Sequence, residues 1–315
     1  MNSTGGYFEL ELRKGKEFHP YAIALNTGRN ALELILKLKK YKKVHVPYYT
    51  CDVILEPLKK TKTLYEFYSV DKNFEPIFDY SILKREDGFL YINYFGLKDI
   101  FICEIAKKCN NLIIDNSQAF FSEPTANIPT FYSCRKFFGV PDGAYLYIDG
   151  ADDIAFPIDH SESRFTHLIK RIDYGAETGF NDFKNNENNM IGQPIKKMSK
   201  LTQALLCNID YKSVSKKRRE NFLFLHKQLS NYNEIEIDFC KELVPMVYPF
   251  LSNQSDLKQN LLKHKIFIAT YWQNVSEWTN KDSLEYKYAQ QIIHLPIDQR
   301  YNFENLKEII NLILK

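Results

Sequence analysis

The sequence predicts an α/β fold in which a mostly parallel sheet is flanked by helices and followed by a smaller C-terminal α/β unit. Strand and helix patterns alternate between residues 44 and 115, and such repeats favour a parallel sheet that is covered on both faces. The chain has 315 residues, which is enough for one large core and a smaller domain. We therefore expect a large domain over residues 1–205, and a linking helix with a small domain over residues 206–315.

The composition is that of an ordinary soluble protein, with 44% apolar and 26% charged residues. A net charge of only +3 does not suggest a nucleic-acid binder. The six cysteines form no C-x-x-C pair and the seven histidines show no metal-type spacing, so we expect neither a metal site nor disulfides. No apolar run approaches membrane-spanning length, and the first residues lack an apolar targeting segment. These features predict a cytoplasmic protein without a membrane anchor.

The elements of the first half follow from the spacing of apolar residues. We expect, in order, a strand or extended arm at 7–12, a short apolar run at 21–25, a helix capped by Asn26 or Thr27, strands at 44–47, 63–70, 89–95, 112–115, 130–132 and 144–148, and helices at 48–60 and 97–109. Residues 149–195 are polar and show no clear periodicity. A stretch of that length in a compact protein tends to be functional, so we interpret it as an active-site flap or a dimer contact.

The second half has shorter patterns, typical of a small α/β unit. We expect helices at 198–211, 216–229, 256–264 and 303–314, and strands at 235–239, 244–250 and 266–271. The basic run 216–219 falls within a helical pattern, and a solvated helix face explains it better than a phosphate-binding patch.

The segment Asn26-Thr27-Gly28 precedes the first helix and is a candidate anion site. The start of a helix has free backbone amides that favour an anion, and Thr27 adds a hydroxyl. Plain N-capping by the same residues is the alternative interpretation.

Asp115 stands at the end of a buried strand, at the sheet edge where ligands of α/β proteins collect. Gln118 follows closely enough to reach the same ligand. The alternative is that Asp115 only caps the following turn.

Lys136 lies in a turn between two expected strands, together with Ser133. An amine in such a place can condense with an aldehyde if it loses its proton easily, which burial and a nearby cation such as Arg135 would both favour. Pyridoxal phosphate (PLP) requires an anion site for its phosphate, a carboxylate against its pyridinium nitrogen and a lysine for its aldehyde. Because the helix start, Asp115 and Lys136 supply these in order, we interpret Lys136 as the Schiff-base lysine of a PLP enzyme. A solvated surface lysine is the alternative.

The ring would place its nitrogen against Asp115 and its phenolic oxygen against Gln118. The sequence contains no G-x-S-x-G, no G-x-x-x-x-G-K-[ST] and no G-x-G-x-x-G. Hydrolase, P-loop and Rossmann interpretations therefore have no local support.

Four segments together resemble the fold-type I PLP-dependent transferases, and above all the DegT/DnrJ/EryC1/StrS aminotransferases, which act on nucleotide-linked keto sugars. They are Asn26–Leu32, Val46–Thr50, Asp115–Ala119 and Ser133–Gly139, and segments 197–204 and 295–298 are similar to later parts of that family. The similarity covers most of residues 21–230 in order and spacing.

The resemblance implies that Thr27 and Gly28 bind the phosphate and that Ser133 adds a hydroxyl to it. It also implies that Lys136 forms the Schiff base and then carries the proton of the reaction. Glutamate as amino donor and a homodimer with shared active sites are further implications. The leading hypothesis is therefore an aminotransferase that acts on a nucleotide-linked keto sugar during surface polysaccharide synthesis.

Two departures from the family pattern motivate an alternative. The aromatic residue that stacks on the cofactor ring would fall at Cys51, so Tyr49 or another residue must stack instead, or the stacking is lost. Residues 195–197 also lack the asparagine that the family has there. The alternative is a catalytically impaired PLP- or sugar-nucleotide-binding protein that acts as a partner or regulator. A sugar dehydratase on the same scaffold ranks third, because Lys136 is present, and a nucleic-acid role for the basic run ranks last.

Overall fold

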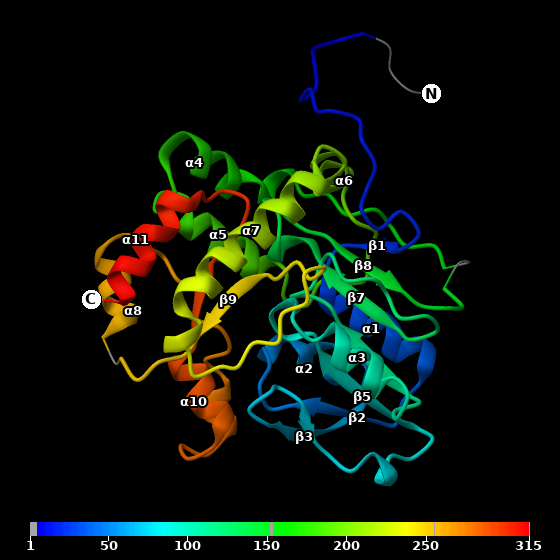
Figure 1. Ribbon diagram of the computed structural model, residues 1–315. Coiled ribbons are helices and arrows are strands. Elements are labelled where there is room, and N and C mark those ends of the chain that lie inside the picture. Colours follow the sequence, from blue (N-terminus) through cyan, green and yellow to red (C-terminus); the bar gives the residue numbers. More distant parts are fainter. Residues whose placement is uncertain (1–4, 152–153, 255, 315) are drawn as a thin grey trace.

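A computed structural model of the chain describes residues 5–151, 154–254 and 256–314. Within these ranges, eight strands form one sheet in the order β1-β8-β7-β6-β5-β2-β3-β4, and two further strands pair separately (Figure 1). The strands are β1 (Ile23–Leu25), β2 (Lys43–Pro47), β3 (Leu64–Val70), β4 (Pro76–Ile77), β5 (Asp87–Ile92), β6 (Leu112–Asp115), β7 (Thr130–Ser133), β8 (Ala144–Tyr147), β9 (Val247–Phe250) and β10 (Ile293–Pro296).

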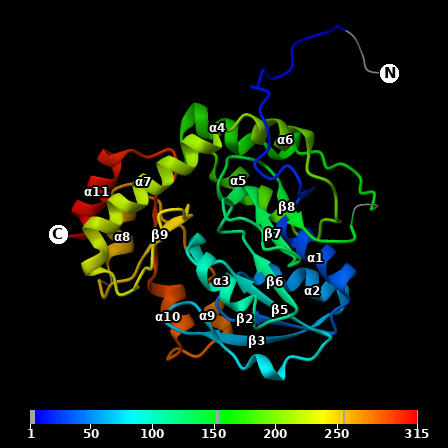
Figure 2. The ribbon, with the colours of Figure 1, turned by 45° about the vertical axis from the view of Figure 1, so that its right-hand side comes forward.

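The helices cover the large sheet and build the rest of the molecule (Figures 1 and 2). They are α1 (Gly28–Lys39), α2 (Leu55–Thr61), α3 (Asp99–Ile105), α4 (Thr166–Tyr174), α5 (Phe180–Asn189), α6 (Lys200–Cys207), α7 (Tyr211–Leu229), α8 (Leu257–Lys263), α9 (Val275–Trp278), α10 (Leu284–Gln291) and α11 (Phe303–Ile313). In both views α7 runs between the sheet on one side and α8 and α11 on the other. None of the helices in the described ranges is both long and apolar enough to cross a membrane.

The centre of the large sheet is parallel and buried. Strands β3, β2, β5, β6 and β7 run parallel to one another, whereas β1, β4 and β8 pair antiparallel at the two sides. All residues of β5 and β6 are buried, as expected for strands that are covered on both faces. The register pairs Ile92 with Asp115, so the carboxyl ends of β5 and β6 meet at one edge. Residues that follow these strands are thereby placed together.

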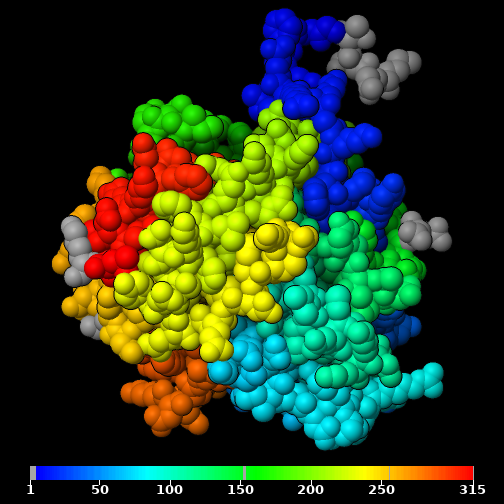
Figure 3. Space-filling model, viewed as in Figure 1, coloured from blue at the N-terminus to red at the C-terminus, as the bar shows by residue number. Residues whose placement is uncertain are grey.

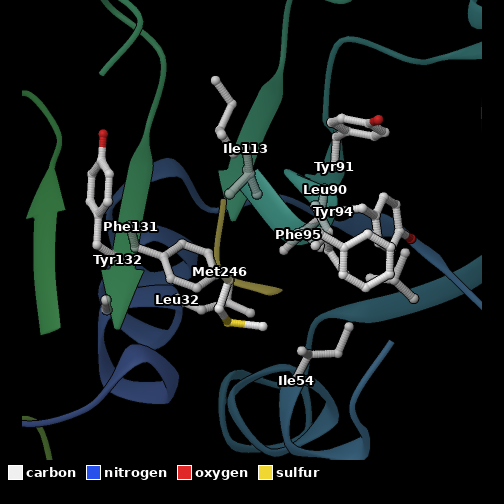
Figure 4. Packing of buried hydrophobic residues seen from close by; sticks show 14 of the residues in the cluster. Leu32, Ile54, Leu90, Tyr91, Tyr94, Phe95, Ile113, Phe131, Tyr132 and Met246 are labelled. Atoms are coloured by element: carbon white, nitrogen blue, oxygen red, sulfur yellow. The ribbon is translucent and has the colours of Figure 1, made fainter. Parts of the chain in front are cut away.

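Two hydrophobic clusters hold the molecule together. The larger one surrounds the eight-stranded sheet and also contains Met246, whose amide donates to the carbonyl of Phe95 at 2.8 Å. Figure 4 shows Met246 in the same packed group as Leu32 and Phe131. The second cluster is formed by α7, α8, α11, β9 and β10. The second half of the chain therefore has a core of its own and also contributes to the core of the first half.

Most of the expected elements are present, with several differences. Residues 149–195 contain α4 and α5. These helices bury few side chains, His167 on α4 and Asn186 on α5. The apolar face of α4 is mostly exposed, and the sequence of α5 is mostly polar. No strand forms at 235–239 or 266–271, because short apolar runs can pack as loops. Of the two alternatives expected for residues 7–12, the extended arm is the one that forms, with Tyr7 99% exposed (Figure 3).

Candidate active site

The start of α1 lies at the sheet edge where the parallel strands end. Thr27 is the N-cap of the helix, and its Oγ1 accepts the backbone N–H of Asn30 at 3.1 Å. A Cβ built on Gly28 would lie 3.8 Å from the Oγ of Ser117 and from the ring of Phe131. The glycine thus leaves space between the helix start and the ends of β6 and β7. The free backbone amides at a helix start can bind an anion that enters this space.

Asp115 ends β6 and is buried. Its Oδ1 accepts the backbone N–H of Ser117 at 2.8 Å. No Lys, Arg or His nitrogen in the described ranges lies within 4.0 Å of this carboxylate. Burial raises the pKa of Asp115, while the bonds from Ser117 and the charge of Lys136 oppose the rise. The carboxylate caps the turn with one oxygen and lacks a close cationic partner.

Gln118 is buried next to the end of β5. Its Oε1 accepts the N–H of Phe95 at 2.7 Å, which leaves the side-chain amide group as a donor. Asn93 holds the same loop, because its Nδ2 donates to Asn116 at 3.1 Å and to Asp99 at 2.6 Å. These bonds keep the Asp115–Gln118 turn in one conformation.

Lys136 ends the short 3₁₀ helix η4 (Cys134–Lys136), which follows β7 directly. Its Nζ lies 5.3 Å from the ring centroid of Tyr271 and makes no hydrogen bond or ion pair with any other residue that the structure describes. Burial raises the pKa of Asp115 and of Cys51, and the amine is close enough to both for its charge to oppose the rise. The amine is thus available for a bond with a ligand.

From the sequence, Lys136 is expected to be buried and to lie beside a free cation, and both expectations are wrong. The side chain is exposed. Arg135 forms an ion pair with Glu187 of α5 and does not act as a nearby free cation. What the lysine has instead is electrostatic contact with Asp115.

Backbone bonds join residues 134–143, the loop that contains Lys136 and is called the lysine loop below, to the start of α1. The N–H of Gly143 donates to the carbonyl of Asn26 at 2.7 Å, and the N–H of Cys134 donates to the carbonyl of Gly143 at 3.1 Å. Gly143 has φ of 114°, a region that favours glycine. The two segments that were expected to bind one ligand are therefore in direct contact.

Ser133 and Tyr49 have different surroundings. The Ser133 side chain makes no hydrogen bond within the part of the chain that the structure describes, so it can serve an anion. Tyr49 is fully buried, its ring lies edge-on to Trp272 at 4.5 Å, and its hydroxyl has no hydrogen-bond partner among the described residues. Its assignment as the ring-stacking residue remains a prediction.

Three residues near Lys136 were missed in the sequence. Besides Tyr271, they are His294, whose ring lies 4.1 Å from that of Tyr271, and Arg218, which packs over the ring of Phe137 at 4.5 Å. Burial lowers the pKa of His294 to about 3. Tyr271 precedes Trp272, which has a positive φ of 57°, a conformation that is uncommon for a bulky side chain. No local motif marks these residues, because they reach the site only through folding of the second half.

The donors at this edge match the three groups of one cofactor. A helix start with free hydroxyls suits a phosphate, a buried carboxylate without a cation suits a protonated ring nitrogen, and an unpaired amine suits an aldehyde. These are the groups of PLP. The residues present therefore fit that cofactor.

No family model matches the sequence, and no curated protein matches it. Solved structures match by fold. The structure of NtdA from Bacillus subtilis with bound cofactor PMP has a TM-score of 0.65 at 14% identity, over 93% of this chain and 72% of its own. The putative sugar aminotransferase Spr1654 from Streptococcus pneumoniae, in its PLP form, has a TM-score of 0.64 at 14% identity, over 92% and 85%. A DegT DnrJ EryC1 StrS aminotransferase from Brucella abortus has 0.60 at 15% identity, over 93% and 85%. The expected fold is confirmed.

Proposed function

We propose that this chain is a PLP-dependent aminotransferase of the DegT/DnrJ/EryC1/StrS type. One observation carries the proposal: the unpaired amine of Lys136, the buried carboxylate of Asp115 and the start of α1 converge on one edge of the sheet. The aminotransferase names of structures with the same fold support it.

The residues that would hold the cofactor come from three elements. The free amides at Gly28 and the hydroxyls of Thr27 and Ser133 would bind the phosphate. Asp115 would pair with the ring nitrogen, and the amide group of Gln118 would donate to the phenolic oxygen. Lys136 would hold the aldehyde carbon.

The bound cofactor supplies an aldehyde that accepts an amino group and a ring that withdraws electrons from the neighbouring carbon. Asp115 would keep the ring nitrogen protonated, because a buried carboxylate stabilises a cation beside it. With the cofactor bound, the amine of Lys136 would accept the proton from the α-carbon of the amino donor and would later return a proton. The chain thus provides one charged group to fix the ring and one amine to move the proton.

The substrates that we propose are glutamate and a nucleotide-linked keto sugar, within surface polysaccharide synthesis. CalS13 from Micromonospora echinospora, which has the same fold at a TM-score of 0.63, is described as a sugar aminotransferase, and Spr1654 as a putative one. This supports a sugar as the acceptor. Glutamate and the nucleotide rest on the family resemblance.

The visible spectrum tests the proposed function. Purified protein mixed with PLP should develop the absorbance band of lysine-bound cofactor, and Lys136→Ala should abolish it. Lys184→Ala is the matched control, since Lys184 is also a lysine beside an aromatic ring, 4.6 Å from that of Phe180, and should keep the band. Addition of glutamate should then remove the band as the amino group moves to the cofactor. A protein that gives no band with PLP would contradict the proposal.

A catalytically impaired PLP-binding protein is the second candidate, and Cys51 favours it. A thiol stands where the resemblance places an aromatic residue over the ring, and a thiol cannot stack. Burial raises the pKa of this thiol, and the charge of Lys136 opposes the rise, so the two groups are neighbours. A band that forms with PLP but does not respond to glutamate would favour this candidate.

We also infer a homodimer that forms through α4 and α5. Several apolar side chains of these helices are exposed, among them Ile172 (83%) and Tyr174 (72%), and Phe180 and Phe183 lie beside them in sequence. The helices contact each other, so their exposed residues lie on neighbouring elements. Exposed apolar side chains in such number are typical of a protein interface.

A further inference from the structure

Arg218 of α7 is one of the largest side chains that the fold buries completely, with 2% of the residue exposed. The solvated helix face expected for residues 216–219 is therefore wrong at this position. Its neighbour Lys216 does point to solvent, with 73% of the side chain exposed. Position 218 lies on the inner side of α7, together with the buried residues Val214 and Phe222, because these are about one turn away on each side.

The guanidinium binds segments from three distant parts of the chain. Its Nε donates to the Oε1 of Gln299 at 3.1 Å, its Nη1 donates to the carbonyl of Met246 at 3.1 Å, and its Nη2 donates to the carbonyl of Phe137 at 3.3 Å. The guanidinium carbon also lies 4.5 Å from the ring centroid of Phe137. Only a forked donor can serve all these acceptors at once.

The charge of Arg218 has no close counter-charge. No carboxylate oxygen in the described ranges lies within 4.0 Å of it, and the nearby Asp298 is bonded to Arg300 at 2.7 Å and 2.9 Å. A buried charge without an ion pair is costly, so polar acceptors must compensate for its lost hydration. The acceptors here are backbone carbonyls and one amide oxygen. This arrangement stabilises the positions of those carbonyls.

The acceptor at Phe137 connects this cluster to the candidate lysine. Its carbonyl accepts two bonds, from Arg218 Nη2 at 3.3 Å and from the Nε2 of Gln299 at 3.1 Å. Phe137 follows Lys136 directly, and its own N–H donates to the carbonyl of Cys134 at 3.1 Å. The end of η4 is thus held by its own first residue, Cys134, and by the second half of the chain.

We propose that Arg218 is a positioning residue for Lys136. Together with Gln299, it anchors the backbone beside the lysine to the second half of the chain. The proposal rests on the proposed function, because the lysine needs a fixed place only if it bonds a ligand. Arg218 touches no reacting atom in this scheme. Its effect passes through the carbonyl of Phe137, the residue that follows Lys136.

Two variants test the proposal. Arg218→Met removes every side-chain donor while keeping a long side chain. Gln299→Met removes one of the two hydrogen bonds to the carbonyl of Phe137. Because Gln299 is only half-buried, this second variant keeps the test valid if the first does not fold. Asn233→Leu is the matched control. Asn233 also anchors the second half by side-chain bonds to backbone, to the carbonyl of Pro249 and the N–H of Leu251, both at 2.9 Å, but it does not contact η4.

Two measurements report on the lysine loop. The first is the rate at which the PLP-loaded protein releases its cofactor, followed by loss of the visible band in excess hydrazine. We expect release about tenfold faster in Arg218→Met and about threefold faster in Gln299→Met, because a mobile lysine holds its bond less well. The second is amide hydrogen exchange of the peptide that contains residues 134–138 in the cofactor-free protein. We expect faster exchange there in both variants, with wild-type exchange in Asn233→Leu.

The outcomes separate this proposal from the proposed function. If wild-type protein gives no band with PLP, the proposed function fails, and hydrogen exchange alone decides whether Arg218 positions the loop. If the band forms but release and exchange at 134–138 are unchanged in the folded variants, the positioning role is overturned. Equal acceleration by Asn233→Leu would overturn it too, because the effect would then reflect general stability.

Discussion

Asp115 combines a structural role with the role that we propose for it. One oxygen caps the turn through the N–H of Ser117, as the alternative interpretation of the sequence expected, while the carboxylate has no cation within 4.0 Å among the described residues. Burial therefore raises its pKa. In the cofactor-free protein this carboxylate is in an unfavourable state, and a cationic ring nitrogen would remove the disadvantage. A group that destabilises the free protein and stabilises the complex is expected at a binding site.

Asp115→Asn should raise the free energy of unfolding of the cofactor-free protein at pH 7. An acid whose pKa is raised by folding binds more protons in the folded state, so its contribution to stability falls as the pH rises above its ordinary pKa of 3.8. The increase in the free energy of unfolding caused by Asp115→Asn should therefore become smaller as the pH falls toward 3.8. Urea denaturation at pH 5 and pH 7 measures it, with the exposed Asp52→Asn as control.

The same variant should bind PLP at least about tenfold more weakly, because a charge-assisted hydrogen bond contributes roughly 1.5–3 kcal/mol. Fluorescence titration of the cofactor measures this affinity. Unchanged affinity would show that Asp115 only caps its turn.

At the scale of elements, the start of α1 serves two purposes. Thr27 caps the helix by accepting the N–H of Asn30, as the alternative interpretation held, and its own O–H remains free to donate. Gly28 keeps space between the helix and Ser117. N-capping and anion binding are therefore compatible at one residue.

Thr27→Val should lower both stability and cofactor affinity. Loss of the cap costs about 1 kcal/mol of the free energy of unfolding, and loss of the hydroxyl should weaken PLP binding several-fold. Ser283→Ala is the matched control, because Ser283 caps α10 by accepting the N–H of Tyr286 at 3.2 Å and lies on another element. The control should lose similar stability, measured by urea denaturation, without losing affinity. Equal affinities in the two variants would contradict a phosphate site at Thr27.

At the scale of the whole molecule, the second half of the chain completes the site. The ring of Tyr271 lies 5.3 Å from the amine of Lys136, and Gln299 binds the backbone carbonyl of Phe137 across 162 positions of sequence. Met246 joins the core of the first half. The second half has a hydrophobic cluster of its own, so its stability does not depend on Tyr271 and Gln299, which contact the lysine loop.

The proposed homodimer makes a prediction at this scale. Ile172→Glu should place a charge in the α4 and α5 interface and convert the dimer to a monomer at micromolar concentration, because burying an unpaired charge is costly. Light scattering coupled to gel filtration measures the mass. Ile82→Glu is the control, since Ile82 is 60% exposed in another part of the chain and should leave the mass unchanged. A wild-type monomer at these concentrations would rule out the interface.

The sequence by itself determined the α/β class and the order of the sheet-forming elements, because strands and caps depend on neighbouring residues. Thr27 could be predicted from helix capping, and Asp115 from its place after a buried strand. The helix α5 could not be predicted, since its sequence is mostly polar and it buries only Asn186, and the strand expected at 266–271 is a loop. Only the tertiary structure decided that Arg218 is buried and that Tyr271 and Gln299 reach Lys136. Such contacts join residues far apart in sequence, and their energies depend on how the two halves pack.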